Sequence, residues 1–162
     1  MLKVINVYQS IAYLVCLEVF IESFVNSFTK NLNLGRAFTS LLLIVLISYV
    51  IYSNISLLIS KKRQLQFIKL NLWFNFFQIF YISLLGFTFY LLLGIQIMPY
   101  VQYIDRITFG VHTESFNSGT SLSYVQGNEI SLGINLIPLI TFIYLDRFSK
   151  KLRISPPEES AR

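Results

Sequence analysis

Apolar residues form four long stretches along this chain, and charged residues gather mostly between and after them. The stretches cover residues 4–28, 37–60, 66–98 and 130–146. A helix of about 18 or more apolar residues can cross roughly 30 Å of hydrocarbon. Only helices and closed barrels satisfy their backbone hydrogen bonds in lipid. The pattern predicts an all-α transmembrane fold: a four-helix antiparallel membrane bundle, with residues 1–162 in a single integral membrane domain.

The segment 99–129 differs from the four stretches. Apolar and polar residues alternate over 107–112, which is the period of a strand, and resume a strand-like pattern at 122–125. Residues 117–120 read Asn-Ser-Gly-Thr, a turn composition. We therefore expect a small β-hairpin-like extracytoplasmic loop between helices three and four. Alternation continues over 130–136, so the start of the fourth helix stays open. Residues 147–162 are expected to form a disordered basic and acidic tail.

Composition agrees with a membrane protein. The chain is 54% hydrophobic with a mean hydropathy of +0.61. Only 13% of its residues are charged, about half of what a soluble domain of ordinary composition carries.

Basic residues cluster on one predicted side of the membrane. The net charge is +5, and the clusters lie after the second and the fourth stretch: Lys61, Lys62, Arg63, Arg147, Lys150, Lys151 and Arg153. Short cytoplasmic loops are enriched in Lys and Arg. The placement predicts a cell-membrane or inner-membrane protein with both termini in the cytoplasm. Because the membrane topology explains the net positive charge, this charge gives no support to nucleic-acid binding.

The acidic residues of the first stretch, the one cysteine and the one histidine argue against a cleaved signal peptide, a disulfide and a zinc site. The first stretch contains Glu18 and Glu22 and no signal cleavage site follows it, so we expect it to remain as a helix. Cys16 is the only cysteine, which excludes an intramolecular disulfide. His112 is the only histidine, whereas catalytic zinc usually takes three protein ligands. No metal or cofactor is expected.

Two acidic residues in the first helix form the main candidate site. Glu18 and Glu22 are four residues apart and share one helix face. With Asn75 and Gln78 of the third helix, they form a candidate intramembrane polar or ion site. Intramembrane carboxylates often mark an ion or proton pathway. Polar residues also hold membrane helices together, which is the favoured interpretation; contact with a lipid or small ligand is a third one.

The outer loop supplies a second candidate site. Asp105, His112, Glu114 and Tyr124 form a candidate interaction loop. An exposed hairpin is marginally stable alone, so it would pack on the bundle as a cap or bind a partner. The first three residues also resemble acid–base machinery, but no enzyme motif accompanies them.

The sequence therefore predicts a non-enzymatic protein, an accessory or assembly subunit in the lipid bilayer. Its partner would be another membrane protein or a second copy of the chain. The alternative is an oligomeric proton- or ion-coupled small transporter that uses Glu18 and Glu22. A lipid-facing enzyme is the third hypothesis.

Overall fold

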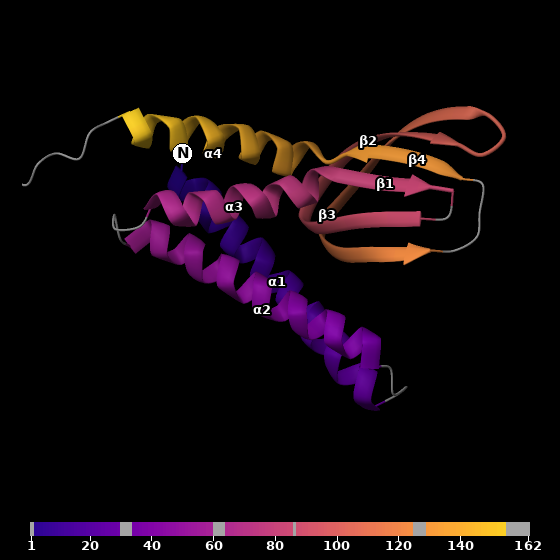
Figure 1. The fold of residues 1–162 in the computed structure, drawn as a ribbon, viewed down its shortest axis with the longest axis horizontal. Coiled ribbons are helices and arrows are strands. Elements are labelled where there is room, and N and C mark those ends of the chain that lie inside the picture. Colours follow the sequence, from indigo (N-terminus) through magenta and orange to yellow (C-terminus); the bar gives the residue numbers. More distant parts are fainter. Residues whose placement is uncertain (1, 30–33, 60–63, 86, 125–128, 155–162) are drawn as a thin grey trace, which may run out of the picture.

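A computed structural model describes residues 2–29, 34–59, 64–85, 87–124 and 129–154. Within these residues the chain forms four helices and one four-stranded antiparallel sheet (Figure 1). The elements follow in the order α1 (Leu2–Thr29), α2 (Leu34–Ile59), α3 (Gln64–Ile79), β1 (Phe80–Leu84), β2 (Phe87–Tyr103), β3 (Ile107–Tyr124), β4 (Ile130–Ile134) and α4 (Leu136–Ile154). The sheet extends away from the ends of α3 and α4.

Helices α1 and α2 pack against each other as a hairpin that crosses α3 and α4 obliquely (Figure 1). In the described part of the chain, two segments are long and apolar enough to cross a membrane: α1 over Leu2–Thr29 and α2 over Ala37–Ile59. Only 39% and 33% of the residues in the apolar windows of these two helices are buried, so most of them are at least partly accessible. These two helices support association with a membrane.

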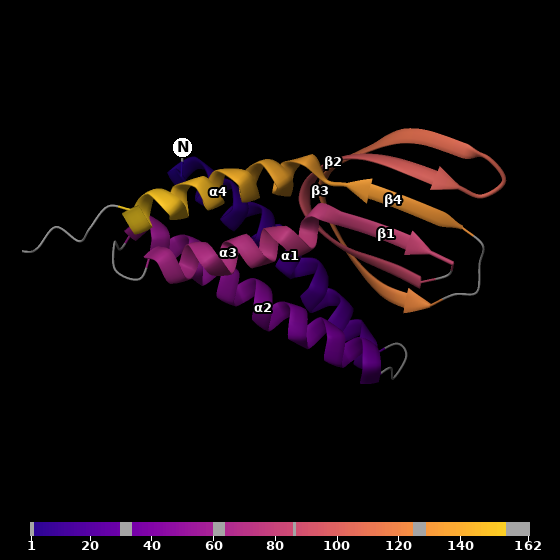
Figure 2. The same cartoon turned by 45° about the horizontal axis from the view of Figure 1, so that its top comes forward.

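Helices α3 and α4 run directly into strands β1 and β4. Asn135 forms two hydrogen bonds at the junction between the helices and the strands. Its backbone N–H donates to the Ile79 carbonyl at 2.7 Å, and its side-chain Oδ1 accepts from the Ile137 N–H at 3.3 Å. Asn135 is therefore the N-cap of α4. Pro138 falls in the first turn of α4, where a missing N–H is tolerated. The result is two antiparallel arms, each part helix and part strand (Figure 2).

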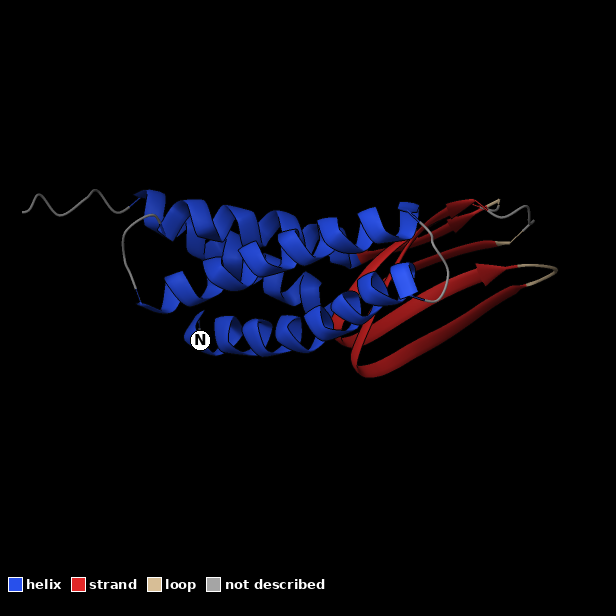
Figure 3. Cartoon of the chain, turned by 90° about the horizontal axis from the view of Figure 1, so that it is seen from below, coloured by secondary structure: helices blue, strands red, loops and turns tan. Residues whose placement is uncertain are grey.

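Strand β2 reverses its direction within the sheet. It pairs antiparallel with β1 over residues 87–90 and antiparallel with β4 over residues 100–103. Since β1 and β4 are themselves antiparallel, the two halves of β2 must run in opposite directions. Strand β3 follows β2 along both halves, so the β2–β3 hairpin bends into a U. Figure 3 shows this bend beside the helices.

Gly94 allows the reversal. It has a positive φ of 85° and lies at a β-bulge between Gly94 and Gln96, and a bulge bends a strand. The bend packs on α1, where the Tyr8 hydroxyl accepts from the Ile95 N–H at 3.1 Å. A Cβ at position 94 would lie 3.0 Å from the Ala12 Cβ and 3.1 Å from the Tyr8 hydroxyl oxygen. The bend therefore depends on the missing side chain both for its dihedral angle and for its contact with α1.

The apolar core lies where α1, α2 and α3 meet the bend. It includes Cys16, Ile47, Val50, Phe74 and Leu93, all of them buried. A smaller cluster around Leu57, Ile68 and Leu145 joins α2, α3 and α4 at the other end.

The predicted all-α bundle is wrong. The helices expected over 4–28 and 37–60 are confirmed as α1 and α2, although residue 60 lies outside the described residues. The helix expected over 66–98 ends at Ile79 and continues as β1 and most of β2. Apolar runs do not distinguish a buried strand from a helix by themselves. Here the run is rich in aromatic residues, which favour strands. It also contains Gly86 and Gly94, and glycine within such a run indicates a turn or a bulge.

The boundaries around the predicted outer loop 99–129 are corrected as well. Strand character over 107–112 is confirmed, but residues 117–120 lie inside β3 and do not form the turn; residues 104–106 connect β2 to β3. The fourth helix, expected over 130–146, begins at Leu136 after β4. It extends to Ile154, so the expected tail 147–162 is helical in its first half. Residues 155–162 lie outside the described residues.

Substituting Gly94 tests the bend. We expect Gly94→Ala to lower the free energy of unfolding by about 1–2 kcal/mol because an L-residue is strained at positive φ, and the contact with Ala12 adds to this loss. The measurement is thermal unfolding of the full chain in detergent, followed by circular dichroism. Gly133→Ala is the control, since its Cβ would meet the flexible Met98 side chain at 3.0 Å. Equal losses for both variants would contradict the role of Gly94.

Candidate functional site

Buried amide side chains connect α1 with α3. Gln9 Nε2 donates to Asn75 Oδ1 at 3.0 Å, and both Gln9 and Gln78 donate to the Tyr13 hydroxyl, at 3.2 and 3.1 Å. Asn71 extends the connection to α2 by donating to the Ser53 hydroxyl at 2.9 Å. We call these residues the amide network: Gln9, Tyr13, Ser53, Asn71, Asn75 and Gln78. It consists of neutral groups that hydrogen-bond between helices, as polar residues of membrane bundles do.

The two predicted glutamates lie elsewhere. Glu18 and Glu22 are exposed on the outer face of α1, whereas Asn75 and Gln78 are buried in the amide network. The structure therefore brings Asn75 and Gln78 together with Gln9 and Tyr13, and does not bring them together with Glu18 or Glu22. Within the described residues, no group of three or more His, Cys, Asp or Glu side chains could hold a metal ion.

The two faces of the sheet differ in chemistry. Cross-strand neighbours share a face, and one row across the sheet reads Phe89, Ile82, Leu132, Val101 and Phe109. The adjacent row, whose side chains point to the opposite face, reads Tyr90, Tyr81, Gly133, Tyr100 and Gly110. One face is thus apolar, and the other carries tyrosines and polar groups.

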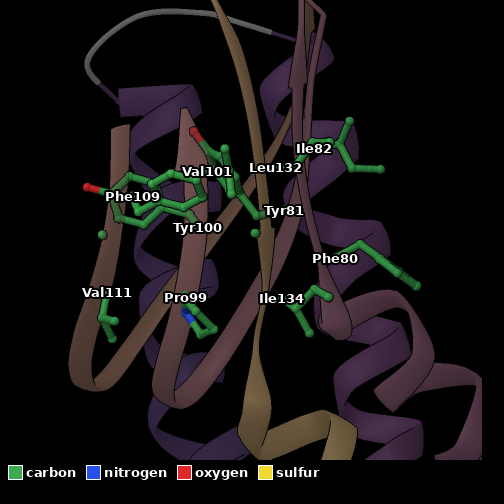
Figure 4. A pocket seen from close by; sticks show the side chains of 12 residues that line it. Phe80, Tyr81, Ile82, Pro99, Tyr100, Val101, Phe109, Val111, Leu132 and Ile134 are labelled. Atoms are coloured by element: carbon green, nitrogen blue, oxygen red, sulfur yellow. The ribbon is translucent and has the colours of Figure 1, made fainter. Parts of the chain in front are cut away.

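The apolar face contains a groove of about 720 Å³ (Figure 4). Side chains of β1, β2, β3 and β4 line it, among them Phe80, Ile82, Pro99, Val101, Phe109, Val111, Leu132 and Ile134. Phe109 is 79% exposed and Val111 is 64% exposed. We call this surface the apolar groove. Exposed apolar surface of this kind marks contact with a protein or a membrane.

The opposite face contains a polar groove of about 400 Å³. Its lining combines tyrosines, amides and carboxylates: Tyr81, Tyr90, Leu92, Gln96, Met98, Tyr100, Gln102, His112, Glu114, Glu129 and Ser131. Gly110 leaves room for Tyr100, since a Cβ there would lie 2.6 Å from its ring. The Tyr81 and Tyr90 rings stack with their centroids 5.6 Å apart.

A polar side-chain contact lies at each end of the polar groove. At the bend, His112 Nε2 lies 3.1 Å from Glu114 Oε1. At the far end, Gln102 Nε2 donates to Glu129 Oε1 at 2.6 Å. Burial raises the pKa of the Tyr81 hydroxyl, and Coulombic interactions with Glu129 and Tyr90 raise it further. Tyr81 therefore remains a neutral hydrogen-bonding group at physiological pH.

The predicted interaction loop is only partly assembled. His112 and Glu114 lie together in the polar groove. Asp105 is exposed at the turn between β2 and β3 and does not line the groove, and the side chain of Tyr124 lies outside the described residues. Sequence spacing does not indicate Gln96, Gln102 and Glu129 as neighbours, because their proximity follows from the reversal of β2 and its pairing with β4. The available signal was the placement of Gln96, Tyr100 and Gln102 at even positions, with apolar residues at the odd positions 97, 99 and 101.

The Tyr13 hydroxyl is the shared acceptor of the amide network. Tyr13→Phe would leave the Gln9 and Gln78 donors without it, and we expect the free energy of unfolding to fall by about 1–2 kcal/mol. Thermal unfolding in detergent measures this loss, with Tyr52→Phe as the control because Tyr52 is exposed on α2. Adding Gln78→Leu to Tyr13→Phe should cost less than the sum of the two single changes. Strict additivity would contradict the coupling.

Neither groove contains a residue pattern that identifies a protein family. Comparison of the chain with known protein families, with curated proteins and with solved structures finds no match. The grooves, the amide network and the exposed face of α1 are therefore the features from which a function can be inferred.

Proposed function

We propose that this chain is a non-catalytic accessory or assembly subunit that binds a membrane protein partner through the exposed face of α1. The position of Glu18 supports this proposal most directly. It lies in a line of exposed residues spaced alternately by four and three: Val7, Ile11, Leu14, Glu18, Ile21 and Val25. This spacing is that of a helix-packing seam. We call these residues the α1 seam.

The depth of Glu18 follows from the packing of α1 on α2. Ser40 Oγ donates to Ser23 Oγ at 3.2 Å, and the helices are antiparallel, so Glu18 lies near the level of Val45. Val45 is eight residues after Ala37, where the apolar span of α2 begins, or about 12 Å along a helix. Val45 itself is an exposed apolar side chain. Glu18 is therefore inside the apolar band of the hairpin.

A carboxylate in that band requires a partner. An ionised acidic side chain in the centre of a membrane helix costs on the order of 3 kcal/mol. Glu18 is separated from the amide network, which lies on the buried side of α1. A partner helix that places a basic or hydrogen-bond-donating side chain against Glu18 would remove most of this cost. Apolar neighbours above and below it in the seam would supply the packing.

The apolar groove supports the same function independently. It is an apolar surface on a sheet that continues α3 and α4 beyond their ends (Figure 1). A partner that packs on the α1 seam in the membrane could also cover this groove with an apolar segment. The basic residues Lys150 and Lys151 of α4 lie at the opposite end of the molecule from the sheet. By the positive-inside rule, that end would be cytoplasmic and the sheet extracytoplasmic.

Photo-crosslinking in the native membrane tests the α1 seam. We expect p-benzoylphenylalanine in place of Leu14 to form one prominent adduct with a distinct membrane protein, because Leu14 lies one turn from Glu18 in the seam. Glu18→Leu should reduce that adduct about tenfold, since a lost charged hydrogen bond is worth roughly 1.4 kcal/mol or more. Mass spectrometry identifies the adduct.

The control places the same photoreactive residue at Val45, which is exposed at a similar depth on α2. Adducts of equal yield from both positions would show unspecific contact and contradict the seam. An adduct of the chain with a second copy of itself would overturn the heteromeric proposal and favour the oligomeric transporter.

Cysteine labelling tests the orientation. In a Cys16→Ala background, we expect Thr108→Cys to react with a membrane-impermeant maleimide on intact cells, because residue 108 is exposed at the far end of the sheet. Lys150→Cys should react only after the membrane is permeabilised. The reverse pattern would overturn the proposed topology.

A further inference from the structure

The polar groove has an acidic residue at each end. Glu114 pairs across strands with Gln96 next to the bend, and Glu129 accepts from Gln102 at the far end. Gln96 and Gln102 are six residues apart on β2, which corresponds to about 20 Å of extended strand. The carboxylates therefore face one elongated groove from its two ends.

The middle of the groove suits a hydrocarbon chain. Tyrosine rings, Met98 and Leu92 line it between the carboxylates. The faces of aromatic rings accept methylene groups and also attract cations. Among the described residues that line the groove, none is Lys or Arg, and His112 is already paired with Glu114. The lining therefore disfavours an anionic ligand.

Gln96 is a second and independent feature of the groove that suits a hydrogen-bonding ligand. Its side chain is only 1% exposed, it lines the groove, and neither its amide oxygen nor its amide nitrogen has a hydrogen-bond partner among the described residues. A buried polar group without a partner costs about 1–3 kcal/mol. A ligand that donates to the Gln96 oxygen near Glu114 would remove part of this cost.

We propose that the polar groove binds a linear aliphatic polyamine, with terminal ammonium groups at Glu114 and Glu129 and the methylene chain along the tyrosines. Ammonium groups donate to the carboxylates and to Gln96, and the spacing of the two acids selects a long chain over a short one. This site is separate from the α1 seam, so it does not depend on the proposed partner.

Isothermal titration of the full chain in detergent tests the site with three probes of increasing length: putrescine, spermidine and spermine. We expect affinity to rise along the series, with spermine at least tenfold tighter than putrescine, because only the longer chain reaches both carboxylates. Glu114→Gln and Glu129→Gln should each weaken spermine about tenfold and reduce the preference for length. These substitutions preserve side-chain shape, and the unaltered chain provides the length series even if a variant does not fold.

Asp105→Asn is the matched control, since it removes one negative charge at an exposed turn outside the groove. We expect it to leave spermine binding within twofold of the unaltered chain. Equal weakening by Asp105→Asn and Glu129→Gln would show general attraction to surface charge and overturn the proposal. Absence of spermine binding below millimolar concentration would overturn it as well.

Discussion

The reversal of β2 at Gly94 is the constraint on which the sheet depends. An ordinary strand of this length would extend along β3 as a flat hairpin and contact either β1 or β4. The positive φ of Gly94 and the adjacent bulge turn β2 back, so that it pairs with both. The same backbone packs on Ala12 and Tyr8 of α1. One glycine therefore shapes the sheet and attaches it to the helical hairpin.

The curved sheet separates two kinds of surface. Since side chains alternate along each strand, a change of register by one residue would exchange the apolar and polar faces throughout the sheet. The contacts of Asn135 with Ile79 and Ile137 oppose such a shift, because they align β4 with the end of α3. The junction between helices and strands thus maintains the register on which both grooves depend.

The helical hairpin could be predicted from sequence, whereas only the strand segment over 107–112 of the sheet could. Over 4–28 and 37–60, the length, the apolar content and the absence of Gly and Pro all indicate helix. Over residues 80–98 the chain is equally apolar, and only the pairing partners decide between helix and strand. Those partners are remote: Ile82 pairs with Leu132, and Val101 pairs with the same residue. Such non-local pairing leaves only the weak alternation seen at 107–112 and 130–136 in the local sequence.

The candidate sites show the same difference. The sequence predicts Asn75 and Gln78 in a polar site between helices, and both are buried with polar partners from α1. Glu18 was expected to face the same interior, but four-residue spacing places residues on one face without saying which face is buried. Because Glu18 is exposed, any group that pairs with it must come from outside the described part of this chain. An ionised carboxylate within an apolar span is costly unless it is paired, and this cost is the physical basis of the proposed partner helix. The polar groove is lined by residues of the sheet and by Glu129, so the ligand proposed for it does not depend on the partner proposed for α1.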